Sequence, residues 1–142
     1  EDEVIVLVGV NDKQMAALPD NVTGIPRTEN VRQLAALYSA AAALVNPTWQ
    51  DNYPTVNLEA IACGTPVITY RTGGSVESVN EDTGFIVEQG DVQGLLDAFR
   101  KIKEAGKNAY ASRCRKYAVE HFGRNDRYRE YLELYQSKIS IR

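Results

Sequence analysis

The strongest constraint on the fold of this chain is the alternation of short, continuously apolar runs with longer stretches of helical periodicity. The runs are rich in β-branched residues, and they cover residues 4–8, 22–25, 41–46, 66–70 and 84–87. A strand that is apolar on both faces is typical of a parallel sheet covered by helices. The run at 41–46 follows a row of alanines, so it could instead prolong the helix before it.

The segments between the runs predict helices. The first is short, is capped by Asn11 or Asp12 and ends at Leu18, and the next two span residues 29–40 and 55–62. Pro54 opens the helix at 55–62 and Gly64 stops it.

The chain after residue 90 is predicted to be helical. Asp91 caps a first helix that ends at Gly106, and its predicted core face is Val92, Leu95, Leu96, Phe99 and Ile102. A second helix spans residues 109–121. Asn125 or Asp126 caps a last helix, which carries Tyr128, Tyr131, Leu132, Tyr135 and Ile139. The whole chain, residues 1–142, is therefore predicted to be a single α/β domain. It has a doubly wound, mostly parallel sheet of about five strands flanked by helices, with a helical C-terminal end.

Composition excludes several classes of protein. The chain has 142 residues, 44% of them hydrophobic and 25% charged, and its net charge of -3 gives no indication of nucleic acid or an anionic membrane as a partner. Cys63 and Cys114 fit reduced core thiols of a cytoplasmic protein, and the single His121 lacks a second histidine with which to share a metal. We expect no metal site.

Ligands of doubly wound sheets gather beyond the carboxyl ends of the strands. The loops at 46–54 and 71–76 both follow predicted strands, so both are expected on that rim. The first loop carries Asp51, and Glu59 follows within the next helix. Each carboxylate could accept hydrogen bonds from sugar hydroxyls, although Asp51 could equally be a helix cap and Glu59 a solvated helix residue.

The second loop carries two glycines between charged residues. Gly73 and Gly74 could let the backbone approach a ligand, or simply form a turn. Arg71 could pair with a diphosphate or with Glu77, and Glu77 could instead complete a capping box. Trp49 flanks the first loop and could stack on a sugar or base, with core packing as the alternative.

The run from Asp51 to Glu59, followed by Ala60-Ile61-Ala62-Cys63-Gly64-Thr65-Pro66-Val67-Ile68, resembles the signature of the family 4 retaining glycosyltransferases, which have the two-domain GT-B fold. That signature is an acidic residue, seven others, then Glu-Ala-x-Ala-x-Gly-x-Pro-Val. The first acidic position is usually Glu in the family and is Asp51 here. Gly73-Gly74-Ser75-Val76-Glu77 resembles the downstream Gly-Gly-x-x-Glu, and Gly84-Phe85-Ile86-Val87 resembles the strand after it.

The resemblance implies a nucleotide-sugar donor site with no metal or other cofactor. Glu59 would hold the ribose hydroxyls and Asp51 would lie near the donor sugar as the catalytic pair. The substrate-binding residues would be Asn52, Tyr53, Pro54, Thr55, Arg71, Gly73, Gly74 and Glu77. The full-length enzyme would move the sugar to a glycan or lipid-linked acceptor with retention of configuration.

The resemblance also implies that parts of the enzyme lie outside this chain. These are the N-terminal, acceptor-binding domain and a first strand and helix whose Arg and Lys hold the diphosphate, so we expect the fragment to be inactive alone. The full-length protein is expected in the cytoplasm, with possible peripheral attachment to the inner membrane face through the missing domain. The aromatic face of the last helix could pack on this domain's own sheet or against a partner surface outside the chain. In the second case its exposure could promote self-association. Two alternatives stay open: another GT-B enzyme such as a sugar nucleotide epimerase, and a non-catalytic binding or interaction domain.

Overall fold

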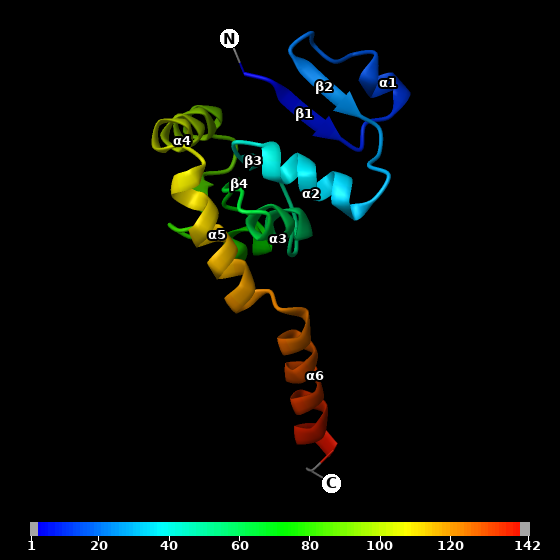
Figure 1. Ribbon diagram of the computed structural model, residues 1–142, viewed down its shortest axis with the longest axis vertical. Coiled ribbons are helices and arrows are strands. Elements are labelled where there is room, and N and C mark those ends of the chain that lie inside the picture. The colour runs from blue at the N-terminus through cyan, green and yellow to red at the C-terminus, as the bar shows by residue number, and fades with distance from the viewer. Residues whose placement is uncertain (1–2, 140–142) are drawn as a thin grey trace. The chain divides into compact units, whose positions relative to one another are not determined.

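The computed structural model describes residues 3–139 of the chain. It divides into two compact units, which meet between Leu37 and Tyr38 in the sequence (Figure 1). Each unit contains parallel strands and helices, as expected of an α/β protein. The predicted sheet of about five strands is present as two separate sheets, one in each unit.

The first unit is built on a two-stranded parallel sheet. Strand β1 (Ile5–Val8) pairs with β2 (Val22–Ile25) along its whole length. The short helix α1 (Asp12–Met15) connects them, and Asn11 caps it in a capping box with Gln14. Helix α2 (Val31–Ala40) follows and leads into the second unit. The predicted cap at Asn11 is therefore confirmed, although α1 ends earlier than Leu18.

The second unit contains a three-stranded parallel sheet in the order β3-β4-β5. Its elements are β3 (Leu44–Asn46), α3 (Thr55–Ala62), β4 (Val67–Tyr70), the 3-10 helix η1 (Gly73–Ser78), β5 (Gly84–Val87), α4 (Val92–Ala105), α5 (Asn108–His121) and α6 (Arg124–Ile139). Helix α2 stops at Ala40 and β3 is a separate strand, so the alanines do not prolong the helix.

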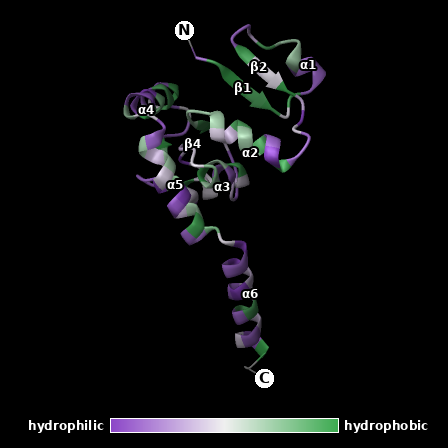
Figure 2. Cartoon of the chain, viewed as in Figure 1, coloured by the Kyte–Doolittle hydropathy of each residue, from purple (hydrophilic) through white to green (hydrophobic). Residues whose placement is uncertain are grey.

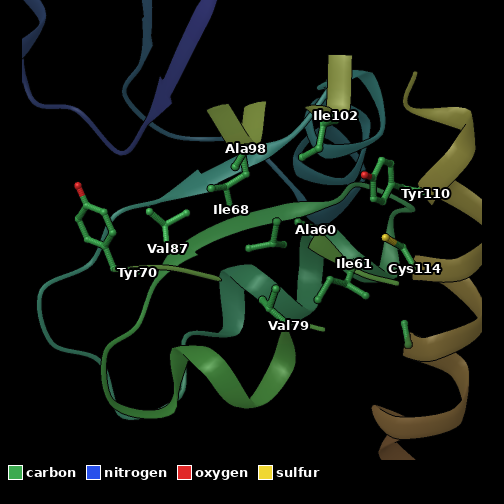
Figure 3. Packing of buried hydrophobic residues seen from close by; sticks show 12 residues of the cluster. Ala60, Ile61, Ile68, Tyr70, Val79, Val87, Ala98, Ile102, Tyr110 and Cys114 are labelled. Atoms are coloured by element: carbon green, nitrogen blue, oxygen red, sulfur yellow. The ribbon is translucent and has the colours of Figure 1, made fainter. Parts of the chain in front are cut away.

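The hydrophobic core lies in the second unit (Figure 3). Ile68 of the central strand β4, Ile61 of α3 and Cys114 of α5 are completely buried and pack in one cluster. Helix α4 adds Ala98 and Ile102 to this core. Its predicted core face was partly wrong, because Val92 and Leu96 are 62% and 47% exposed. The buried stripe follows the four-residue spacing from Ala98 to Ile102 instead.

The last helix, α6, begins at Arg124, before either predicted cap. Figure 2 shows it as mostly hydrophilic with hydrophobic residues interspersed. The side chains that the pattern placed on one apolar face, Tyr128, Tyr131, Leu132, Tyr135 and Ile139, are all exposed. No helix within residues 3–139 is both long and apolar enough to cross a membrane.

Candidate functional site

The two predicted rim loops come together at the carboxyl ends of neighbouring strands. Strands β3 and β4 are parallel and paired, so the loops that follow them leave the same edge of the sheet. The hydroxyl of Thr72 donates to the carbonyl oxygen of Thr48 at 3.0 Å. The backbone N–H of Gly74 donates to the carbonyl oxygen of Asp51 at 3.1 Å. The predicted placement of both loops on one rim is confirmed.

The glycines of the second loop permit this contact between the loops. A Cβ atom on Gly74 would lie 1.8 Å from the carbonyl oxygen of Asn52, and one on Gly73 would lie 2.2 Å from that of Asp51. Gly73 also has a positive φ of 42°. Both clashes are with backbone atoms, which cannot rotate away. Glycine is therefore required here because one loop packs directly against the other.

The carboxylate of Asp51 organises its own loop. Its Oδ1 accepts a hydrogen bond from the backbone N–H of Tyr53 at 3.0 Å, and the residue is only half-buried. The N-cap of α3 is Pro54, which makes no side-chain capping bond. Asp51 thus shapes the turn before α3 and does not cap the helix, which leaves the rest of the carboxylate available to a ligand.

Most of the predicted binding residues on these loops reach solvent. The exposed ones are Asn52, Tyr53, Thr55, Gly73 and Glu77, whereas Pro54 and Gly74 are buried. Burial, and then the negative charge of Glu77, raise the pKa of Tyr53. Tyr53 and Glu77 are therefore within electrostatic reach of each other. Pro54 and Gly74 shape the site through the backbone alone.

Glu59 has a partner that the sequence did not suggest. The phenol of Tyr38 donates to Oε2 of Glu59 at 3.1 Å. Burial, and then the Glu59 carboxylate, raise the pKa of Tyr38, so the phenol keeps its proton. The carbonyl oxygen of Tyr38 accepts hydrogen bonds from Thr65 Oγ1 at 2.5 Å and from Lys107 Nζ at 3.3 Å. Tyr38 is thus fixed at both ends and orients the exposed carboxylate of Glu59.

Arg71 also has an unexpected partner. Its Nε donates to Oε1 of Glu88 at 2.7 Å, so it pairs with Glu88 and not with Glu77. Both side chains are more than half exposed, so the pair can open at little cost. The alternative of a capping box with Glu77 is not formed either, because the N-cap of η1, Thr72, makes no side-chain capping bond and the hydroxyl of Ser75 has no hydrogen-bond partner. Trp49 is 66% exposed and meets Tyr70 edge-on, which excludes Trp49 from the core.

Among residues 3–139, no group of three or more His, Cys, Asp and Glu side chains is arranged to hold a metal ion. The rim itself presents carboxylate, amide and backbone N–H groups. Such groups bind hydroxyls and phosphate oxygens through hydrogen bonds.

Comparison with known proteins identifies the family. Residues 2–104 match the family described as Glycosyl transferases group 1. The chain belongs to this family. A curated relative, D-inositol 3-phosphate glycosyltransferase 2 of Catenulispora acidiphila, is 39% identical over 85 residues, which cover 54% of this chain and 20% of the relative.

Solved structures show the same fold. Sucrose-phosphate synthase from Thermosynechococcus elongatus superposes with a TM-score of 0.78 at 25% identity, covering 96% of this chain and 39% of that one. HepE from Anabaena, determined in complex with UDP, superposes with a TM-score of 0.79 at 23% identity, covering 96% of this chain and 42% of that one. This glycosyltransferase domain thus spans less than half the length of each of these proteins.

Proposed function

We propose that this chain is the donor-binding part of a retaining glycosyltransferase. The observation that carries the proposal is the packing of the two rim loops at the carboxyl ends of β3 and β4. This packing gathers Asp51, Tyr53 and Glu77 beside the start of α3, where hydroxyls and phosphate oxygens find acceptors and backbone donors. The UDP complex of HepE, a structure with the same fold, supports a nucleotide-sugar donor.

The reaction exchanges one bond at the anomeric carbon of the donor sugar. The bond to the diphosphate oxygen breaks, a bond to the acceptor oxygen forms on the same face, and the acceptor proton leaves with the diphosphate. Glu59, oriented by Tyr38, holds the ribose hydroxyls. Asp51 lies beside the donor sugar, where its charge favours the positive charge that develops on the ring.

The remaining predicted residues position the donor. Asn52, Thr55 and Gly73 present polar or backbone groups at the rim, with Pro54 and Gly74 shaping the loops beneath them. Arg71 exchanges Glu88 for a phosphate oxygen when the donor binds. Further cations and the acceptor site come from outside this chain, so the fragment alone is inactive. The full-length enzyme works in the cytoplasm, with peripheral attachment to the inner membrane face, on a glycan or lipid-linked acceptor and without a metal.

The test is nucleotide-sugar transfer by the full-length protein, with and without EDTA. Glu59→Gln keeps the shape of the side chain and removes its charge, so we expect the donor KM to rise about tenfold or more, since hydrogen bonds to charged groups are strong. Glu104→Gln is the matched control, because Glu104 is exposed on α4.

Three outcomes would contradict parts of this proposal. Nucleotide binding without transfer by the full-length protein would favour a binding domain. Conversion of the donor sugar to an epimer would favour another GT-B enzyme. Loss of transfer in EDTA would contradict the metal-free mechanism.

A further inference from the structure

Helix α3 buries a polar side chain that none of the proposed binding roles uses. Its buried residues are Asn57, Ala60 and Ile61, and Asn57 is completely buried. A primary amide in such a place destabilises the fold unless its donors and acceptor are all satisfied. The same position on an ordinary core helix would carry an aliphatic side chain. An asparagine at this buried position is therefore explained only by the hydrogen bonds that its amide makes.

The amide of Asn57 connects three separate elements. Its Oδ1 accepts a hydrogen bond from Nδ2 of Asn46, the last residue of β3, at 2.9 Å. Its Nδ2 donates to the carbonyl oxygen of Ser75 and to Oγ of Ser78, both at 3.4 Å. Ser75 and Ser78 belong to η1, which begins at Gly73 in the second rim loop. One side chain thus joins the end of β3, the helix that carries Glu59 and the loop that carries Glu77.

The network is tight at one end and loose at the other. The bond to β3 has ordinary length, whereas both bonds to η1 lie at the long limit for a hydrogen bond. The hydroxyl of Ser75 is completely buried and has no hydrogen-bond partner. A buried, unpaired hydroxyl costs stability that a small shift of η1 toward a partner would recover. The η1 end of the network therefore has room to tighten.

Resting on the proposed function, we propose that Asn57 is a positioning residue that fixes η1 against α3 and thereby sets donor affinity. The second rim loop packs directly on the loop of Asp51, and the backbone N–H of Gly74 donates to the carbonyl oxygen of Asp51 at 3.1 Å. Any movement of η1 is therefore passed to the turn that presents Asp51 and Tyr53. Donor binding shortens the long bonds from Asn57, and loss of these bonds releases η1.

The test uses the full-length enzyme and three substitutions. Asn57→Ala removes all the hydrogen bonds. Asn57→Asp keeps an acceptor for Asn46 but cannot donate to the carbonyl oxygen of Ser75. Ser78→Ala removes two long bonds, one from Nδ2 of Asn57 and one to the carbonyl oxygen of Ser75, and is the variant expected to fold normally. Ile102→Val is the control for general destabilisation, because Ile102 is completely buried in α4 and takes no part in either loop.

We expect Asn57→Ala and Asn57→Asp each to raise the donor KM about tenfold, with Ser78→Ala giving a rise of about twofold. The acceptor KM stays unchanged in all three. Hydrogen exchange in residues 71–78 becomes faster in the Asn57 variants, and donor no longer slows it to the wild-type rate. Ile102→Val lowers the Tm without changing either KM.

The possible results separate this inference from the proposed function. Transfer by the wild type with unchanged donor KM in Ser78→Ala and in whichever Asn57 variant folds would overturn the positioning role alone. Equal rises in both KM values would do the same, since they indicate general loosening. Absence of transfer by the wild type would overturn the proposed function and this inference together.

Discussion

Strands β1 and β4 have nearly the same kind of sequence and very different surroundings. β1 reads Ile-Val-Leu-Val and all four residues are exposed, whereas β4 reads Val-Ile-Thr-Tyr and all four are buried. β4 pairs with a strand on each side, while the described part of the chain gives β1 one neighbour, β2. An apolar strand can therefore be buried, and the number of neighbouring elements determines how much of its surface is buried.

The difference extends to the two units as wholes. Within residues 3–139, every buried residue lies in the second unit. The proposed donor site also lies on that unit, on loops held by its core strands. A site that must hold hydroxyls at fixed distances benefits from rigid support. The well-packed unit is thus the one that carries the proposed donor site, and the first unit is the more easily perturbed.

The largest expected effect comes from truncating one apolar side chain in each of the two strands. Ile68→Ala in β4 removes a completely buried side chain and should cost about 2–5 kcal/mol. Val6→Ala in β1 removes a side chain that is 45% exposed, so the cost should stay below about 1 kcal/mol. Native-state hydrogen exchange on peptides covering each strand measures both changes. A cost for Val6→Ala as large as that for Ile68→Ala would show that β1 is covered in solution.

The same contrast shows what local sequence could and could not predict. The apolar runs located the five strands found within residues 3–139, and Pro54 and Gly64 located α3, because turn chemistry and periodicity are local properties. The division into two sheets was not predictable in this way. Pairing depends on which strands lie side by side, and nothing within the run at 4–8 specifies how many neighbours it has.

In the candidate site, too, the local features were predictable from the sequence and the long-range contacts were not. The predicted strand before residues 46–54 indicated a loop on the rim, and Pro54 and Gly64 indicated the helix after it; both are present. The partners of these residues were missed, because Tyr38 lies 21 residues from Glu59 in the sequence. Glu88 likewise lies 17 residues from Arg71. The buried position of Asn57 could have been predicted from the sequence, because Asn57 lies on the same face of α3 as Ala60.

An intermediate effect is expected from adding a methyl group at matched glycines. In Gly74→Ala the Cβ meets the backbone carbonyl of Asn52, and in Gly24→Ala it meets the side chains of Met15 and Leu18. Backbone cannot yield as a flexible thioether can, so we expect about 1–3 kcal/mol for Gly74→Ala and less than about 1 kcal/mol for Gly24→Ala. Urea unfolding of the 142-residue chain, followed by circular dichroism, measures both. Equal costs would mean that the first unit is packed as firmly as the second.

The smallest effect is a loss of stability at alkaline pH that is confined to the second unit. Burial raises the pKa of the Cys114 thiol from its ordinary value of 9.0 to about 11. The folded state therefore holds the proton more tightly than the unfolded state, and its contribution, complete below pH 9, is lost as the pH rises toward 11. At pH 10, one unit above the ordinary pKa, this loss should be about 1.4 kcal/mol.

The first unit contains no cysteine, so its stability should not follow this titration. Hydrogen exchange at matched pH values, corrected for the intrinsic exchange rate, distinguishes the two units, and thiolate absorbance reports the titration itself. Cys114→Ala is the control: it lowers stability at every pH by leaving a cavity, yet it removes the slope between pH 9 and 11 that the thiol provides. A slope that persists in Cys114→Ala would assign the alkaline loss to another group in the second unit. Tyr38 is the first to examine, because burial and the Glu59 carboxylate raise its pKa in the same direction.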